Sequence, residues 1–126
     1  MSSLLTPFNT ALVTLLQNNT MDNKMVDLNV DEWTQKEYLH NKQLLEAQGT
    51  KVILVDTILN SIEGADTITY SPPLMKQEPV GSVFVFYCDS GKGTHSRLKE
   101  FRSKFPDHVC ISLKGGRGYW RKNLQQ

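Results

Sequence analysis

The chain has 126 residues, a formal net charge of +1, 39% hydrophobic residues and 21% charged residues. This length and composition suit an ordinary globular protein, and we expect a single domain over residues 1–126. The near-zero net charge gives no electrostatic argument for binding nucleic acid or a membrane surface. No apolar stretch approaches the roughly 20 residues that a membrane-spanning helix needs.

The N-terminal sequence and the two cysteines bear on the compartment. The first ten residues, MSSLLTPFNT, have neither the basic region nor the long apolar region of a secretory signal. Without export, two cysteines in a chain of this size favour free thiols over a disulfide. We therefore expect a cytoplasmic protein in a reducing compartment.

The N-terminal part of the chain predicts two helices with a short strand between them. Thr6 can cap the first helix. The apolar residues of that helix recur on one face, namely Phe8, Ala11, Leu12, Leu15 and Leu16. Residues 25–30 alternate apolar and polar side chains, which indicates a short edge strand. Asp31 can cap the second helix, which we expect to run to Ala47 and to stop at Gly49.

The remainder of the chain alternates strands with connecting segments and a further helix. Compact apolar or β-branched runs predict strands at residues 51–57, 65–70, 83–87 and 108–113. A helical pattern begins at about Thr94 and ends at Pro106. This alternation predicts an α/β domain of three layers, with a central, mostly parallel sheet of 4–5 strands and helices on both faces.

The segment around Cys88 predicts a reactive site. A strand, a short loop with two glycines and a helix follow one another, so Cys88 lies at the carboxyl end of a strand, near backbone N–H groups. Proteins of the α/β class place anion sites at such points, and a thiol there can ionise below its usual pKa of about 8.5. We expect Cys88 to be the catalytic nucleophile. The expected anion cradle consists of Asp89, Ser90, Gly91, Lys92, Gly93 and Thr94. The simpler alternative is a buried cysteine that ends a core strand.

Other residues near this segment admit two interpretations each. Asp56, at a strand's carboxyl end, either supports the cysteine loop by accepting its N–H bonds or is an ordinary turn aspartate. Lys92 and Arg97 either bind an anion or are solvated cations. His95 either stabilises a thiolate or is an exposed polar residue. Cys110 lies inside an apolar strand and is expected to be structural.

Two features near the end of the chain are expected to support this site. Gly115 and Gly116 should form a turn that packs the chain end beside the cysteine loop. Trp120 is expected to fill the core rather than to bind a cofactor. We expect no metal and no cofactor.

Four stretches give the chain a resemblance to the single-domain rhodanese-like family. ILVDT (53–57) and IEGA (62–65) are similar to two strand and loop signatures of the family. FYCDSGKGTHS (86–96) is similar to its active-site loop, and LKGGRGYW (113–120) to its C-terminal signature. The chain departs from the family at Thr57 and at Gly93, where arginines are usual, and at Ser61, where a histidine is usual.

The resemblance implies a sulfurtransferase or persulfide carrier. Cys88 would take sulfur from a small donor, thiosulfate or a persulfide, and pass it to a thiol acceptor. The two glycines of the loop, Gly91 and Gly93, would leave room for the added sulfur. The alternative is a catalytically degenerate rhodanese-like domain that acts as a binding or regulatory module.

Two further alternatives share the same loop. SGKGT resembles the phosphate-binding P-loop of nucleoside monophosphate kinases, but Phe86 stands where that motif needs a glycine, and too little chain follows Thr94 for the usual nucleotide domain. A cysteine-based phosphatase or arsenate reductase needs an arginine six residues after the cysteine. Thr94 holds that position, so a phosphate would lack its main partner.

Overall fold

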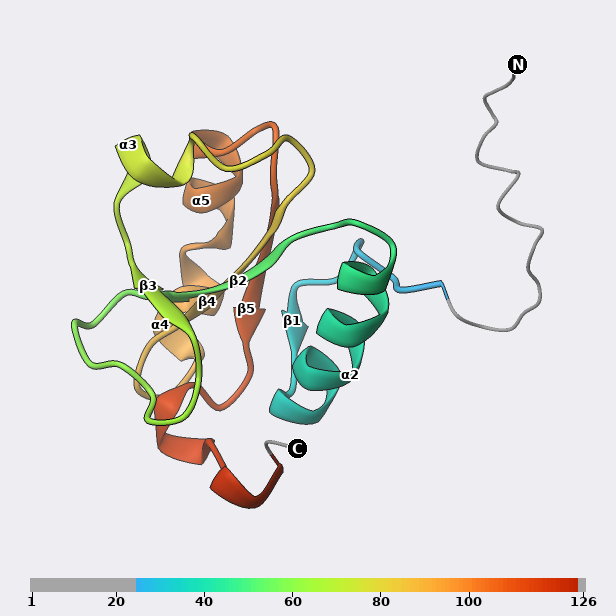
Figure 1. Cartoon of the computed structure of the whole chain (residues 1–126). Coiled ribbons are helices and arrows are strands. Elements are labelled where there is room, and N and C mark those ends of the chain that lie inside the picture. The colour runs from blue at the N-terminus through green and yellow to red at the C-terminus, as the bar shows by residue number, and fades with distance from the viewer. Residues whose placement is uncertain (1–24, 125–126) are drawn as a thin grey trace, which may run out of the picture.

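A sheet of five parallel strands forms the centre of the protein in residues 25–124, which are the residues that the computed structural model describes (Figure 1). The strands are β1 (Glu32–Trp33), β2 (Val52–Asp56), β3 (Thr67–Thr69), β4 (Val83–Tyr87) and β5 (Val109–Leu113). They lie in the order β1-β5-β4-β2-β3, and every neighbouring pair is parallel. Because β4 is the middle strand, the residue that follows it emerges at the centre of the sheet's carboxyl edge.

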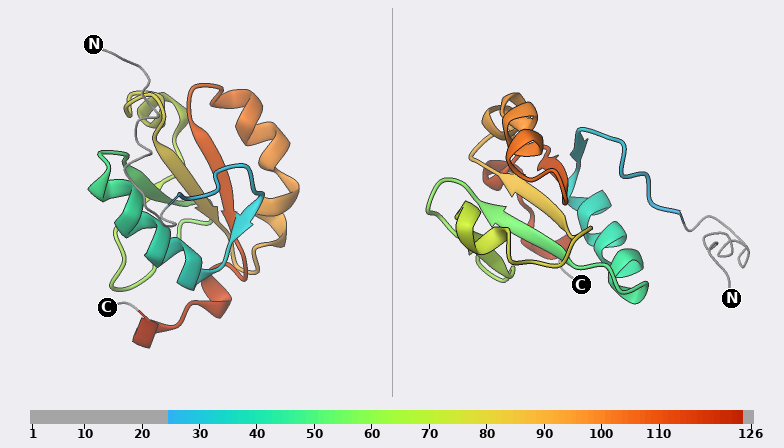
Figure 2. Two further views of the ribbon diagram at one scale, coloured as in Figure 1. Left: turned by 90° about the vertical axis from the view of Figure 1, so that its right-hand side faces the viewer. Right: turned by 90° about the horizontal axis from the view of Figure 1, so that it is seen from above.

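Helices cover both faces of this sheet. They are α2 (Gln35–Ala47), α3 (Pro72–Met75), α4 (Lys92–Ser96) and α5 (Leu98–Lys104), followed by the 3₁₀ turns η1 (Arg117–Tyr119) and η2 (Lys122–Leu124). Figure 2 shows α2 on one side of the sheet and α5 on the other. The predicted α/β class, with a parallel sheet and helices on both faces, is confirmed. No helix in residues 25–124 combines the length and apolar character needed to cross a membrane.

Alternate residues of β4 belong to two separate hydrophobic clusters. Val83, Val85 and Tyr87 pack in the cluster that includes residues of α2. Phe84 and Phe86 pack in the cluster that includes residues of α3 and α5. All five side chains are fully buried. Since successive side chains of a strand point to opposite faces, a strand covered on both faces is apolar throughout, which is why this run indicates a buried strand.

The later elements lie close to their predicted positions. The four strands predicted after residue 50 correspond to β2, β3, β4 and β5, and each end differs by two residues or fewer. The helix predicted from Thr94 begins earlier, at Lys92, and is divided in two at Arg97, whose φ of −95° and ψ of 4° interrupt the helix. α5 ends at Lys104, before Pro106 as predicted.

The N-terminal boundaries differ from the prediction. The edge strand is not at residues 25–30 but at β1, which pairs with β5. Thr34 rather than Asp31 caps α2. The Thr34 hydroxyl accepts a hydrogen bond from the Glu37 N–H (3.1 Å), and the Glu37 carboxylate accepts one from the Thr34 N–H (2.8 Å). This reciprocal capping box satisfies both N–H groups, whereas Asp31 pairs with Arg102.

The C-terminal end of α2 lies where the sequence predicts it. α2 ends at Ala47, as predicted, and Gly49 follows with a φ of +89°. A positive φ suits glycine because it has no Cβ. The helix predicted from Thr6 lies outside the described residues.

Candidate active site

Cys88 is the first residue after the central strand β4, and its sulfur lies inside a tight loop. The Gly91 N–H donates a hydrogen bond to Sγ at 3.2 Å, and the Thr94 hydroxyl lies 3.7 Å from Sγ. A Cβ placed on Gly93 would lie 3.5 Å from Sγ, so the absence of a side chain there leaves space beside the sulfur. The cysteine is partly exposed and forms no disulfide. These contacts form a site in which backbone and hydroxyl donors surround an accessible thiol.

The loop lowers the pKa of the Cys88 thiol below its ordinary value. Burial alone raises that pKa, because it disfavours the charged thiolate. The Thr94 N–H and hydroxyl and the N–H groups of Gly91 and Ser90 lower it, and together they outweigh burial. A thiolate is the nucleophilic form of cysteine, so this loop favours the reactive state.

The buried Thr94 hydroxyl lies beside the sulfur, and the buried Ser112 hydroxyl lies beside that of Thr94. The Thr94 and Ser112 oxygens are 2.7 Å apart, and each lies 3.4 Å from the carbonyl oxygen of Gly91. Both side chains are almost completely buried, and Ser112 belongs to β5. A thiolate can only accept hydrogen bonds. When Cys88 is ionised, Thr94 can therefore donate to Sγ while Ser112 donates to Thr94.

Ser112 was missing from the predicted site. Its only signal in the sequence is a hydroxyl within the apolar run VCISL, near the carboxyl end of a strand. That signal becomes informative once β5 is known to lie beside β4 and α4.

The turn after β5 holds the cysteine loop through backbone hydrogen bonds. The Arg117 N–H donates to the Cys88 carbonyl at 2.7 Å, and the Gly118 N–H donates to the Asp89 carbonyl at 2.8 Å. A Cβ on Gly116 would lie 2.3 Å from the Cys88 carbonyl oxygen, a separation that no real side chain can adopt. The prediction that this glycine turn packs beside the cysteine loop is confirmed.

Gly91, in the cysteine loop, lies equally close to the backbone of the turn after β5. Its φ is +87°, and a Cβ there would lie 2.7 Å from the Gly115 nitrogen and 2.8 Å from the Leu113 carbonyl oxygen. Gly115 also has a positive φ, of +83°. The two loops therefore interlock through backbone atoms, which only glycine permits at these positions.

Asp56 does not support the cysteine loop directly, contrary to one of the two interpretations. Its carboxylate accepts hydrogen bonds from the N–H groups of Ile58 (2.8 Å) and Asn60 (2.7 Å) in its own loop. The backbone N–H and the hydroxyl of Thr57 donate to the Tyr87 carbonyl oxygen, immediately before Cys88. Asp56 thus shapes the neighbouring loop, because a turn aspartate reaches N–H groups two to four residues ahead more easily than those of another strand.

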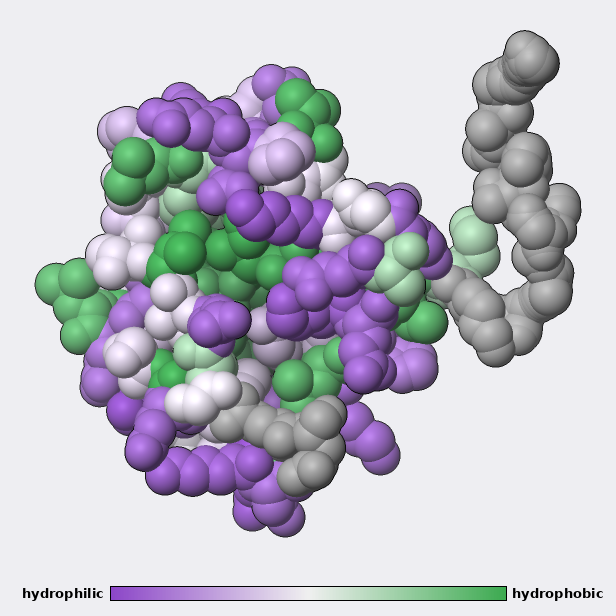
Figure 3. Space-filling view, in the orientation of Figure 1, coloured by the Kyte–Doolittle hydropathy of each residue, from purple (hydrophilic) through white to green (hydrophobic). Residues whose placement is uncertain are grey.

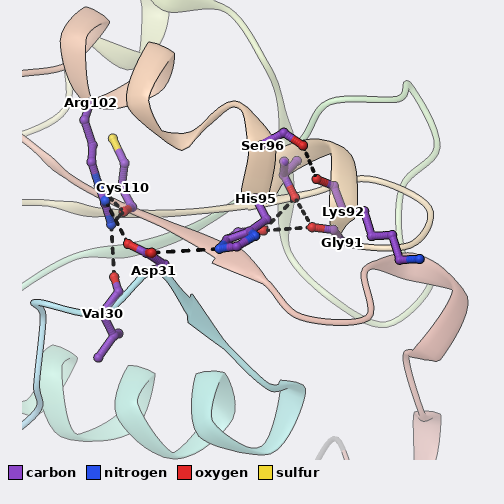
Figure 4. A network of polar contacts seen from close by, with 10 residues as sticks. Val30, Asp31, Gly91, Lys92, His95, Ser96, Arg102 and Cys110 are labelled. Carbon is purple, nitrogen blue, oxygen red and sulfur yellow. Dashed lines mark hydrogen bonds and ion pairs between the residues drawn. The ribbon is translucent and has the colours of Figure 1, made fainter.

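The charged residues near the loop are exposed to solvent or pair with other residues. His95 is half exposed and faces Asp31, with 3.8 Å between its Nε2 and a carboxylate oxygen (Figure 4). Arg97 pairs with Glu100 at 3.0 Å. Lys92 is exposed, which fits either of its two interpretations. Backbone and hydroxyl donors, not these cations, are therefore the groups bonded to the sulfur.

The remaining predicted site residues lie around the entrance of the loop. Asp89 and Ser90 are exposed, and the Ser90 hydroxyl accepts a hydrogen bond from the Lys92 N–H at 3.3 Å.

Trp120 packs against the core cluster under α2, and the centre of its ring lies 6.0 Å from that of Tyr38, so its predicted core role is confirmed. Residues 25–124 contain no group of three His, Cys, Asp or Glu side chains arranged to hold a metal ion.

Comparison with protein-family models, with curated proteins and with solved structures finds no match for this chain. The resemblance to rhodanese-like proteins therefore stays a prediction from the sequence.

Proposed function

We propose that this protein is a sulfurtransferase or persulfide carrier in which Cys88 is the nucleophile. The observation that carries the proposal is the environment of Sγ, which accepts an N–H from Gly91 at 3.2 Å, lies 3.7 Å from the Thr94 hydroxyl, and lies beside Gly93, where a Cβ would stand at the ordinary contact distance of 3.5 Å. Hydrogen-bond donors stabilise a thiolate. Because Gly93 has no side chain, one further sulfur atom can be accommodated beside Sγ.

The reaction consists of two thiol exchanges. The Cys88 thiolate attacks the outer sulfur of a donor persulfide, and a new bond forms between that sulfur and Sγ. The donor's sulfur–sulfur bond breaks, and its electron pair leaves on the donor thiolate. An acceptor thiolate then attacks the outer sulfur, and the electron pair of the broken bond returns to Sγ. Neither step needs an external oxidant or reductant, because one sulfur–sulfur bond replaces another.

A persulfide donor suits this loop better than thiosulfate. Lys92 is the only cation between Cys88 and Thr94, and Asp89 places a negative charge next to the cysteine. A dianion held at Sγ itself would be repelled by that carboxylate, and residues 89–94 of the loop include no arginine to bind it. The reaction needs a reduced thiol, which agrees with a cytoplasmic location.

The lack of an arginine in the loop also supports a second candidate, a rhodanese-like module that binds a partner without turnover. Mass spectrometry separates the two. The reduced protein is exposed to a persulfide donor, and the added mass is located on a peptide. We expect one sulfur atom, about 32 Da, on Cys88. A Cys88→Ser variant should remain unmodified, whereas a Cys110→Ser variant should load like the wild type. Absence of an adduct on Cys88 would favour the binding module.

A further inference from the structure

An open pocket of about 700 Å³ adjoins the cysteine loop. It lies between the start of α2, the loop itself, the turn after β5 and the C-terminal segment, and its wall includes Ser90, Gly91 and Lys92. The volume is in the range of about 300–1,000 Å³ that small-molecule sites occupy. Cys88 does not itself line the pocket, but Gly91 does, and its N–H donates a hydrogen bond to Sγ, so this one residue contacts both the pocket and the nucleophile.

Four cations from four different segments line the pocket. They are Lys36 at the start of α2, Lys92 at the start of α4, Lys114 after β5, and Arg121 near the end of the chain. Among residues 25–124, Glu32 is the only carboxylate residue in the lining. A pocket with this excess of positive charge attracts ligands that carry several negative charges.

These cations are available to a ligand. All four are exposed, and none forms an ion pair with any residue in the range 25–124. By contrast, Lys42, Arg102 and Lys122 are held by carboxylates at 2.7–3.0 Å. Hydrophilic side chains also cover the lower end of the molecule in Figure 3, where the C-terminal segment lies.

Two large apolar side chains add a second kind of contact. Tyr119 is 72% exposed and Leu124 is 40% exposed, and both line the pocket. The Tyr119 side chain is packed against Gly115, where a Cβ would lie 2.7 Å from the tyrosine Cβ. The ring is therefore positioned by the same glycine turn that holds the cysteine loop. A ligand with an apolar or aromatic portion would cover these side chains.

We propose that this pocket binds the body of a polyanionic thiol, which receives sulfur from Cys88 as the acceptor. The phosphate or carboxylate groups of the thiol pair with Lys36, Lys114 and Arg121, and its sulfur reaches Cys88 past Gly91. This inference rests on the proposed sulfur transfer for the role of the ligand, but its binding can be measured without any turnover. The transfer itself is the second exchange described above, in which the acceptor thiolate takes the outer sulfur.

Binding is tested on the full-length Cys88→Ser protein by titration calorimetry, with coenzyme A and pantetheine as probes. The two share the same thiol arm, and only coenzyme A carries phosphates. We expect coenzyme A to bind at least tenfold more tightly, with a difference that shrinks as salt screens the charges. A second pair, the peptides Cys-Glu-Glu-Glu and Cys-Gln-Gln-Gln, determines whether carboxylates serve as well as phosphates.

The matched variants are Lys36→Glu with Lys114→Glu, and Lys76→Glu with Lys99→Glu. The second pair makes the same change of charge at exposed lysines outside the pocket. We expect only the first pair to remove the preference for coenzyme A. Equal binding of coenzyme A and pantetheine, or equal effects of the two double variants, would overturn the proposal whether or not Cys88 carries sulfur. Selective binding without transfer from sulfur-loaded wild type would overturn the acceptor role and leave an anion pocket.

Discussion

The two cysteines occupy contrasting environments, one inside a strand and the other just past the end of the neighbouring strand. Cys110 lies within β5, where it pairs in register with Phe84, and only 2% of its surface is exposed. Burial raises the pKa of the Cys110 thiol to about 11, even though the Arg102 guanidinium opposes the rise. Cys88 lies one residue past β4, and the pKa of its thiol is lowered. A position at the end of a strand rather than inside one thus separates a thiol with a lowered pKa from a thiol with a raised pKa.

The two pKa values differ because the backbone N–H groups around the two cysteines donate their hydrogen bonds to different acceptors. Inside a strand these groups bond to the neighbouring strands, so a side chain there meets mainly hydrocarbon. In the loop after β4, N–H groups turn toward Sγ instead. A nearby cation is not sufficient, because Arg102 donates two hydrogen bonds to the Cys110 carbonyl oxygen and still does not offset burial.

Alkylation should show the largest difference between the two sites. At pH 7 we expect iodoacetamide to modify Cys88 more than about 100-fold faster than Cys110, because two pKa units change the thiolate fraction by that factor and burial adds to it. Quenched samples analysed by peptide mass spectrometry give both rates in one experiment. Comparable rates for the two thiols would contradict the contrast.

Gly116→Ala tests the support that the glycine turn gives to the reactive site. The new Cβ would collide with the Cys88 carbonyl oxygen, so we expect the free energy of unfolding to fall by about 2–4 kcal/mol. Gly81→Ala is the matched control. Gly81 also has a positive φ, +90°, but a Cβ there meets nothing within 4 Å, so only conformational strain of about 1 kcal/mol is expected. Urea unfolding measures both, and equal losses would show that the contact with the loop is unimportant.

The pH dependence of stability should have opposite signs for the two thiols. The raised pKa of Cys110 contributes stability that is complete below the unfolded-state pKa of about 8.5 and is lost as the pH rises toward 11, by about 3 kcal/mol. The lowered pKa of Cys88 contributes stability above about pH 8.5, and this is lost as the pH falls through the folded-state value.

Urea unfolding from pH 7 to pH 10.5, under reducing conditions, isolates these contributions by subtraction. The stability difference between wild type and Cys110→Ala should narrow as the pH rises, and that between wild type and Cys88→Ala should shift in favour of the wild type. Parallel pH profiles for all three proteins would contradict the assigned pKa directions.

The smallest expected effect concerns the buried hydroxyl pair. Ser112→Ala removes the group that can donate to Thr94, so we expect the pKa of Cys88 to rise and its alkylation rate at pH 7 to fall several-fold. Ser96→Ala is the control, because its hydroxyl donates to the Lys92 carbonyl on the exposed side of α4. The rates of both variants should converge with wild type at high pH, where every thiol is ionised. A pH profile for Ser112→Ala identical to the Ser96→Ala profile would rule out a role for Ser112.

The sequence predicts the parts of this molecule that depend on local patterns. The run at β4 is apolar on both faces because both faces are covered, and this pattern alone indicates a central parallel strand. Cys88 is recognisable because Gly91 and Gly93 follow it within five residues, and the turn after β5 is recognisable from the adjacent pair Gly115 and Gly116. In each case the residues that indicate the strand or turn belong to the same short segment that forms it.

The parts that the sequence misses depend on distant contacts or on competing local signals. β1 has two residues and exists through its pairing with β5, so no pattern of its own marks it. Asp31 and Thr34 are both good capping residues, and only Thr34 has a glutamate three residues ahead. Ser112 becomes part of the site because β5 places it beside Thr94, a neighbour that local patterns do not reveal.

The central claim is that Cys88 carries and releases sulfur, and a single-turnover transfer tests it most directly. Wild-type protein is loaded with isotopically labelled sulfur from a donor persulfide, freed of the donor, and mixed with a thiol acceptor. We expect the label to leave Cys88 and to appear on the acceptor as a persulfide in equal amount, and we expect Cys88→Ser to transfer none. Label that never loads onto Cys88, or that stays on it in the presence of acceptor, would contradict the account.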